Sequence, residues 1–190
     1  MRYDPEHKAR TRERIEATAA ERFRAEGIDA VGVASLMESA GLTHGGFYAH
    51  FESKDALVAA AIAHGAEQAL AHLQKRMARH PALPKPVAFA KVYLSERHRD
   101  SAAEGCVAAA LGAEIGRRDD ATRAHFTAQL AAMLDCAAPE RGTPAERRDA
   151  ALATVSLAVG ALILSRAVDD PKLSKQLLAA GVKASETLAG

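Results

Sequence analysis

The chain has 190 residues but no tryptophan, only 4% aromatic residues and just two cysteines. Cys106 and Cys136 are far apart and form neither a metal-ligand pattern nor a disulfide framework. Such cysteine usage excludes a small disulfide-rich secreted domain and predicts a reduced, cytoplasmic protein. The charged N-terminus lacks the apolar core of a signal peptide, and we expect no cofactor.

The sequence also lacks a large excess of positive or of negative charge. The formal net charge is +1, and the first 54 residues hold eight Lys or Arg against nine Asp or Glu. There is no global basic field that would attract nucleic acid. Any DNA affinity must therefore come from local placement, for which the basic cluster Lys8, Arg10, Arg12 and Arg14 is the candidate.

Long apolar runs are absent except for one segment of sixteen residues without charge, 150–165. This is shorter than the roughly 20 residues that cross a bilayer, so we expect no membrane contact. A helix that is apolar on every side is typical of burial. We expect one face to cover its own domain and the other a partner chain.

The sequence predicts an all-α fold, because no strand-like alternation occurs and hydrophobic residues make up 48% of the chain. Helix boundary signals are frequent: Gly27 is placed to end the first helix as a glycine C-cap, and Asp119-Asp120 to cap a later helix. Thr143-Pro144-Ala145-Glu146 combines a cap, an N1 proline and a capping-box glutamate. The proline-rich segment 81–86 is the clearest break. The expected helices are 5–25, one opened by Gly32, 43–51, 53–79, 87–98, 106–117, 119–137, one from 144, and one from 171 to near the end.

The segment 41–57 carries the most information. Gly41 suits the left-handed backbone of a tight turn between helices, and Thr43 is placed to cap the next helix. Phe47 and Phe51 are four residues apart and can anchor that helix in a core. This pattern is typical of a helix-turn-helix.

The same segment resembles a known family. Matching positions are spread over residues 8–57: Arg14-Ile15-Glu16-Ala17 with Phe23 and Gly27, Val33-Ala34-Ser35-Leu36-Met37 with Ala40-Gly41, and Gly46-Phe47-Tyr48-Ala49-His50-Phe51 with Ser53, Lys54 and Leu57. They resemble the DNA-binding domain of the TetR/AcrR transcriptional regulators. The resemblance implies an N-terminal three-helix DNA-binding domain, 1–52, joined by a long fourth helix to a helical ligand-binding and dimerisation domain, 53–190.

The resemblance also implies a function and its partners. We expect a non-enzymatic, ligand-responsive repressor that binds an operator in double-stranded DNA and pairs as a homodimer through its last two helices. An unknown small-molecule inducer would release it. Each dimer would place two recognition helices in major grooves. The expected DNA contacts are Thr43, His44, Gly45, Gly46, Tyr48, His50 and Lys54, with Lys8 and Arg12 from the first helix.

The C-terminal region is where the resemblance places a ligand pocket. Apolar residues of its helices could line a cavity: Phe89, Tyr93, Cys106, Leu111, Phe126, Leu130 and Met133. Tyr93, His98 and Glu114 are the candidate polar anchors.

Cys106 supports a second hypothesis, because it follows Gly105 at an expected helix N-terminus near Arg97, His98 and Arg99. Positive charge there favours the reactive thiolate. Two alternatives to the repressor stay open. One is a small-molecule-binding or redox-sensing helical protein without specific DNA binding, which the near-neutral N-terminal domain and the weak N-cap Gly32 also favour, and the other is a helical adaptor dimer.

Overall fold

The computed structural model describes residues 5–188, and this part of the chain is helical with no strand. The all-α prediction is confirmed. The elements are α1 (Pro5–Glu26), α2 (Val33–Ser39), the 3₁₀ helix η1 (His44–Ala49), α3 (Lys54–Met77), α4 (Lys85–Tyr93), α5 (Glu96–Asp100), the 3₁₀ helix η2 (Ala102–Glu104), α6 (Val107–Ile115), α7 (Asp120–Ala137), α8 (Pro144–Ala167) and α9 (Pro171–Leu188).

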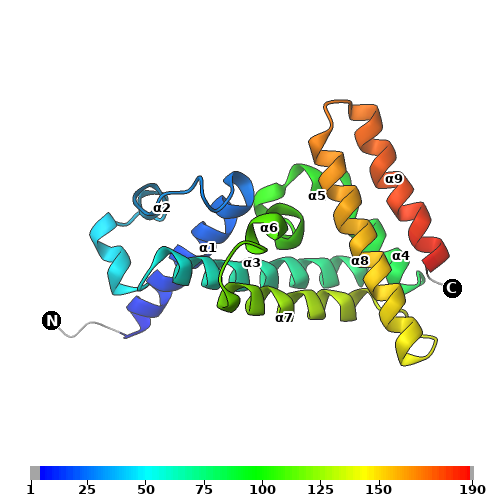
Figure 1. Cartoon of the computed structure of the whole chain (residues 1–190), viewed down its shortest axis with the longest axis horizontal. Coiled ribbons are helices and arrows are strands. Elements are labelled where there is room, and N and C mark those ends of the chain that lie inside the picture. The colour runs from blue at the N-terminus through cyan, green and yellow to red at the C-terminus, as the bar shows by residue number, and fades with distance from the viewer. Residues whose placement is uncertain (1–4, 189–190) are drawn as a thin grey trace.

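The molecule is elongated, with α1, α2 and η1 at one end and the α8–α9 hairpin at the other (Figure 1). The long helix α3 runs between the two ends, and α7 packs along it. A single rigid helix therefore connects the N-terminal bundle to the C-terminal helices.

The N-terminal core is built from buried residues of α1, α2, η1 and the first half of α3. Phe23, Phe47 and Leu57 are essentially inaccessible to solvent. The two turns that close this bundle use glycines with left-handed backbone, Gly27 (φ +90°) and Gly41 (φ +68°), as the sequence predicted. Residues of α6 also join this core, so it extends beyond the first 52 residues.

The C-terminal helices surround a second core, and their predicted caps are present. Asp119 accepts the backbone N–H of Thr122 at the start of α7. Thr143 and Glu146 form the capping box of α8, with Pro144 in its first turn. These are local signals, which explains why the sequence placed both helix starts correctly.

Two boundaries differ from the sequence prediction. The expected helix 87–98 is broken into α4 and α5, because Ser95 Oγ donates to the Val92 carbonyl (2.9 Å) and accepts from the backbone N–H of His98 (3.4 Å). The expected loop 99–105 instead holds the end of α5 and η2.

The expected helix 43–51 also differs from its prediction. It forms a 3₁₀ helix, and Thr43 stands at its N-cap without making a side-chain cap bond. The backbone N–H of Gly46 instead bonds to the Thr43 carbonyl at 3.0 Å. Two adjacent glycines favour an α-helix poorly, which is consistent with the tighter, shorter form.

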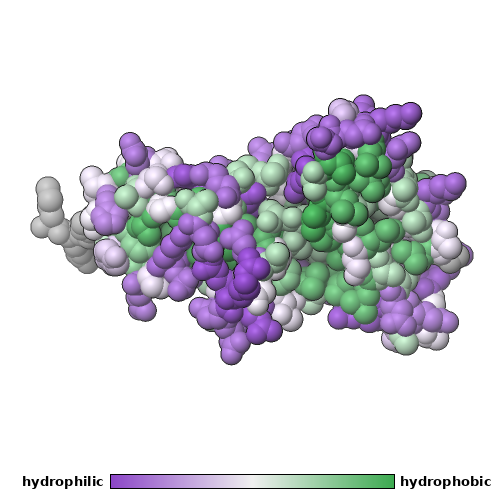
Figure 2. Space-filling model, turned by 45° about the horizontal axis from the view of Figure 1, so that its top comes forward, coloured by the Kyte–Doolittle hydropathy of each residue, from purple (hydrophilic) through white to green (hydrophobic). Residues whose placement is uncertain are grey.

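Helix α8 is the one helix among the described residues that is long and apolar enough to cross a membrane, yet 39% of its most apolar window is buried within the protein. Other apolar side chains of α8 reach the surface, where Leu152, Ile163 and Leu164 are 42%, 42% and 53% exposed; Leu173 of α9 is exposed as well. Figure 2 shows hydrophobic surface gathered over this end of the molecule. An exposed patch of this kind is typical of a protein–protein interface.

Candidate DNA-binding surface and ligand cavity

The helix-turn-helix consists of α2, the turn at Gly41 and η1. Phe47 anchors η1: it is 1% exposed, and its ring lies 5.2 Å from that of Tyr48 and 5.8 Å from that of Phe51. With this side of η1 fixed in the core, the other side faces outward. The helix-turn-helix expected from the sequence is thus present as a packed unit.

Most of the expected DNA-contacting residues lie on that outward side. Tyr48 is 69% exposed, and Thr43, His44 and Gly45 are exposed as well. Lys54 is half-buried in the first turn of α3, and Gly46 is half-buried near the Met37 side chain. Hydroxyl, imidazole and ammonium groups of this kind can donate to phosphate oxygens.

Arg12 and His50 are more engaged with the protein than the sequence suggested. Arg12 pairs with Glu16 (2.8 Å), donates to the His50 carbonyl (2.7 Å) and lies over the Phe51 ring at 4.3 Å. It therefore ties α1 to the end of η1. Burial lowers the pKa of His50, and the charges of Lys8 and Arg12 add to the effect.

A cavity of about 290 Å³ lies among α3, α4, α6, α7 and the α5–η2 segment. It is at the small end of ligand pockets, which measure about 300–1,000 Å³. Five of the seven expected ligand-binding residues line it: Tyr93, Cys106, Phe126, Leu130 and Met133.

The other two expected residues do not line this cavity. Phe89 is fully buried in the C-terminal core, where its ring stacks on that of Tyr93 at 5.3 Å. Leu111 belongs to the N-terminal core. Glu114, an expected polar anchor, instead accepts the backbone N–H of Ile28 at 2.9 Å. Apolar periodicity marks a buried face but does not show whether a core or a cavity lies beyond it.

His98 is the best-defined polar group of the cavity wall. Its Nε2 accepts the backbone N–H of Cys106 (3.0 Å), so its Nδ1 carries the proton and donates to the Tyr93 carbonyl (2.7 Å). Burial lowers the pKa of His98 to about 4, with smaller effects from Arg166 and Arg76. The imidazole is therefore neutral near pH 7, and its two hydrogen bonds connect α4 to the start of α6.

Cys106 is buried at the N-cap of α6, with its Sγ 3.9 Å from the Met133 sulfur. Cys136 lies half-buried near Met77, with 3.5 Å between the sulfurs. Over residues 5–188 no group of His, Cys, Asp and Glu is arranged to hold a metal ion.

Sequence reasoning missed Arg24, which links the N-terminal bundle to the η2 segment beside the cavity. This arginine of α1 is 4% exposed and donates from Nε to the Ala103 carbonyl of η2 at 2.6 Å. It passes Gly65 of α3 so closely that a Cβ there would lie 2.3 Å from its Nη1. Burial lowers its pKa. Because η2 directly precedes Gly105 and Cys106 of the cavity wall, Arg24 connects α1 to a segment beside the cavity.

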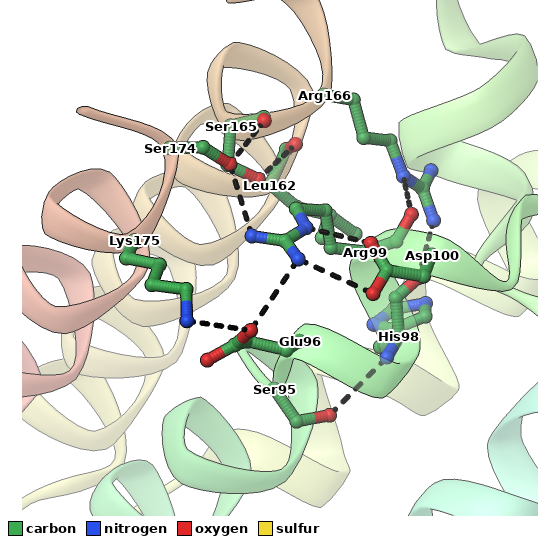
Figure 3. A network of polar contacts seen from close by, with 10 residues as sticks. All are labelled: Ser95, Glu96, His98, Arg99, Asp100, Leu162, Ser165, Arg166, Ser174 and Lys175. Atoms are coloured by element: carbon green, nitrogen blue, oxygen red, sulfur yellow. Dashed lines mark hydrogen bonds and ion pairs between the residues drawn. The ribbon is translucent and has the colours of Figure 1, made fainter. Parts of the chain in front are cut away.

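A second polar network joins the cavity to the C-terminal hairpin (Figure 3). Arg166 of α8 donates to the carbonyls of His98 (2.6 Å) and Arg99 (3.0 Å). Arg99 donates to Ser174 of α9 at 3.1 Å, and Lys175 pairs with Glu96 at 3.3 Å. The short helix α5, which carries His98, is thus held by both helices of the hairpin.

These features define a class: an all-α protein with a helix-turn-helix at one end, a small cavity in its middle and an apolar hairpin at the other end. The family model "Bacterial regulatory proteins, tetR family" matches residues 15–61. This match confirms the predicted resemblance to the tetR family over these residues.

Solved structures extend the likeness to nearly the whole chain. NemR from E. coli in its reduced form has a TM-score of 0.74 at 18% identity, over 94% of this chain and 96% of that chain. A TetR transcriptional regulator from Chloroflexus aurantiacus has a TM-score of 0.73 at 22% identity, over 96% and 95%. A TetR-family regulator from Cytophaga hutchinsonii has 0.75 at 19%, over 95% and 96%. No curated protein gives a significant match. At these identities, the likeness shows a common fold.

Proposed function

We propose that this protein is a cytoplasmic, homodimeric transcriptional repressor that a small-molecule inducer releases from its operator. Residues 1–52 would bind double-stranded DNA, and residues 53–190 would bind the effector and the second subunit. The protein would act by binding and not by catalysis.

The observation that carries this proposal is that one helix serves both regions. The first half of α3, including Leu57 and Ile62, is packed in the N-terminal core. Its second half, including Leu70, Leu73 and Arg76, lines the cavity. A ligand that alters the position of α3 would therefore also alter that of η1.

Two further contacts would couple the N-terminal bundle to the cavity region. Arg24 of α1 bonds to η2, and Glu114 of α6 bonds to the backbone that follows α1. Inducer and operator would then favour different arrangements of these contacts. Coupling of this kind is reciprocal and typically amounts to about 1–3 kcal/mol. Equal ligand affinity of the free and the operator-bound protein would contradict it.

The DNA-binding role is tested with a fluorescent duplex that carries the DNA next to the protein's own gene, in the presence of random competitor DNA. We expect tight, competitor-resistant binding whose affinity falls steeply with salt, because each phosphate contact releases counterions. Lys54→Ala should weaken binding to specific and random DNA alike, and it should reduce the salt slope by about one per subunit.

The control for this experiment is Lys91→Ala, which removes an exposed lysine of α4 at a position far along the chain from the helix-turn-helix. It should leave both affinity and salt slope unchanged. If the protein binds several neighbouring intergenic fragments no more tightly than random DNA, the repressor proposal is wrong.

The dimer is tested at the exposed apolar patch of α8 and α9. We expect Leu164→Glu to convert the dimer into a monomer, because a carboxylate buried in an apolar interface lacks a partner. Ala124→Glu, at an exposed position of α7, is the matched control. Sedimentation velocity reads the mass; a Leu164→Glu protein that stays dimeric would place the interface elsewhere.

A second candidate function is a small-molecule-binding or redox-sensing protein without specific DNA binding. The position of Cys106 in the cavity wall favours it. If the protein shows no specific DNA binding and the Cys106 thiol is lost under mild oxidant, this second candidate is favoured.

A further inference from the structure

The wall of the cavity carries an unbalanced charge. Four cationic side chains line it, Lys75, Arg76, Arg79 and Arg97, against the single carboxylate of Glu104. Within residues 5–188, none of these four cations forms an ion pair. Among the described residues, the side chain of Arg76 makes a single, long hydrogen bond, to Ser95 Oγ at 3.4 Å.

Six arginines outside the cavity pair with an acid within residues 5–188, whereas others, such as the surface residues Arg117 and Arg148, do not. Arg12, Arg22, Arg99 and Arg118 each pair with a carboxylate. Gathering four unmatched cations around one hollow is unfavourable on its own, since like charges repel. An anion in the hollow would remove that cost and would accept the charge-assisted hydrogen bonds that guanidinium groups offer.

Two polar atoms of the cavity wall also lack partners. Gln129 Oε1 and the Tyr93 hydroxyl are buried without an oxygen or nitrogen partner in the described structure. Burial raises the pKa of Tyr93, and the Cys106 thiol beside it adds to the effect, so the hydroxyl keeps its proton and can donate. Buried polar groups are nearly always hydrogen-bonded, so an acceptor group of a bound molecule would satisfy the Tyr93 hydroxyl, whereas Gln129 Oε1 needs a donor.

The rest of the wall is apolar, with Leu70, Leu73, Phe126, Leu130 and Met133 from α3 and α7. Leu73 and Met133 are buried, whereas Lys75, Arg79 and Arg97 are exposed. Lys75, Arg79 and Arg97 therefore stand at the outer part of the cavity and Leu73 and Met133 at its inner part, while Arg76, Phe126 and Leu130 are half-buried. His98, neutral near pH 7, adds no charge between them.

We infer that the effector of this cavity is a small organic acid, with its anionic group held by Arg76 and Arg97 and its apolar body against Phe126, Leu130 and Met133. This inference rests on the proposed function, because it assigns a chemical class to the proposed inducer. The volume suits one small molecule of this kind.

The test compares acids with their uncharged amides on the full-length protein by titration calorimetry. The probes are benzoate, 4-phenylbutyrate and octanoate, each beside its primary amide. We expect at least one acid to bind about tenfold more tightly than its amide. If no acid of the series binds more tightly than its amide, the inference is wrong.

The double variant Arg76→Met/Arg97→Met removes both charges and keeps much of the side-chain volume. It should abolish the preference for the acid and leave the weaker amide binding unchanged. Arg148→Met, an exposed position of α8 outside the cavity, should keep the full preference. An acid preference that survives the double variant would also overturn the inference.

Measuring operator binding on the same preparations separates this inference from the proposed function. Tight operator binding without any acid preference refutes the ligand class and leaves the repressor proposal standing. An acid preference that depends on Arg76 and Arg97, without operator binding, supports the ligand class and refutes the repressor.

Discussion

Replacing Phe47 with alanine is expected to lower the free energy of unfolding by about 3–5 kcal/mol, the usual loss for a fully buried aromatic side chain. The ring is 1% exposed and packs against Tyr48 and Phe51 within the N-terminal core. It is also what fixes η1 to that core, and two glycines leave η1 little helical stability of its own. The variant should therefore lose operator binding as well as stability.

The adjacent residue gives the matched comparison. Tyr48 is 69% exposed, so Tyr48→Ala should change the free energy of unfolding by no more than about 1 kcal/mol. It should still weaken DNA binding, because a hydroxyl placed to donate to phosphate is removed. Urea unfolding and the duplex titration read the two effects. A Phe47→Ala protein as stable as the parent would contradict the packing described for η1.

The second large effect concerns pH. The pKa of His98 is about 4 in the folded protein against 6.5 for the free side chain. Below pH 6.5 the unfolded chain takes up a proton that the folded protein does not accept, so stability falls as pH falls. The loss begins near pH 6.5, is complete near pH 4 and amounts to about 3 kcal/mol, at about 1.4 kcal/mol per pH unit.

His98→Gln tests this prediction. The variant should be less stable than the parent at pH 7.5, because the imidazole bonds to the Tyr93 carbonyl and the Cys106 N–H are disturbed. Its stability should nevertheless fall less steeply between pH 6.5 and 4.5 in urea unfolding. Val92→Ala, a non-titrating change in the same wall, should lower stability equally at every pH. Parallel slopes for His98→Gln and the parent would refute the assignment.

The sequence predicted the positions of residues better at one candidate site than at the other. For the helix-turn-helix, spacing within 41–57 was enough to place Phe47 inward and Tyr48 outward, while the DNA contacts themselves stay a prediction. For the cavity, five of the expected residues line it, but Phe89 and Leu111 do not. The lining cations were missed, although Arg76 follows Leu73 by three residues and therefore shares its helical face.

What the sequence determined by itself is local: the helical class, the glycine turns at Gly27 and Gly41, the caps at Asp119 and Thr143, and the helix-turn-helix pattern. These depend on backbone geometry and on hydrogen bonds that span only a few residues. Tertiary structure decided the rest. Arg24 meets Ala103, Arg99 meets Ser174, and Arg97 joins the three cations of residues 75–79 around one cavity, only because segments far apart in the chain pack together. Long-range packing of this kind leaves no mark in the spacing of residues along a single helix.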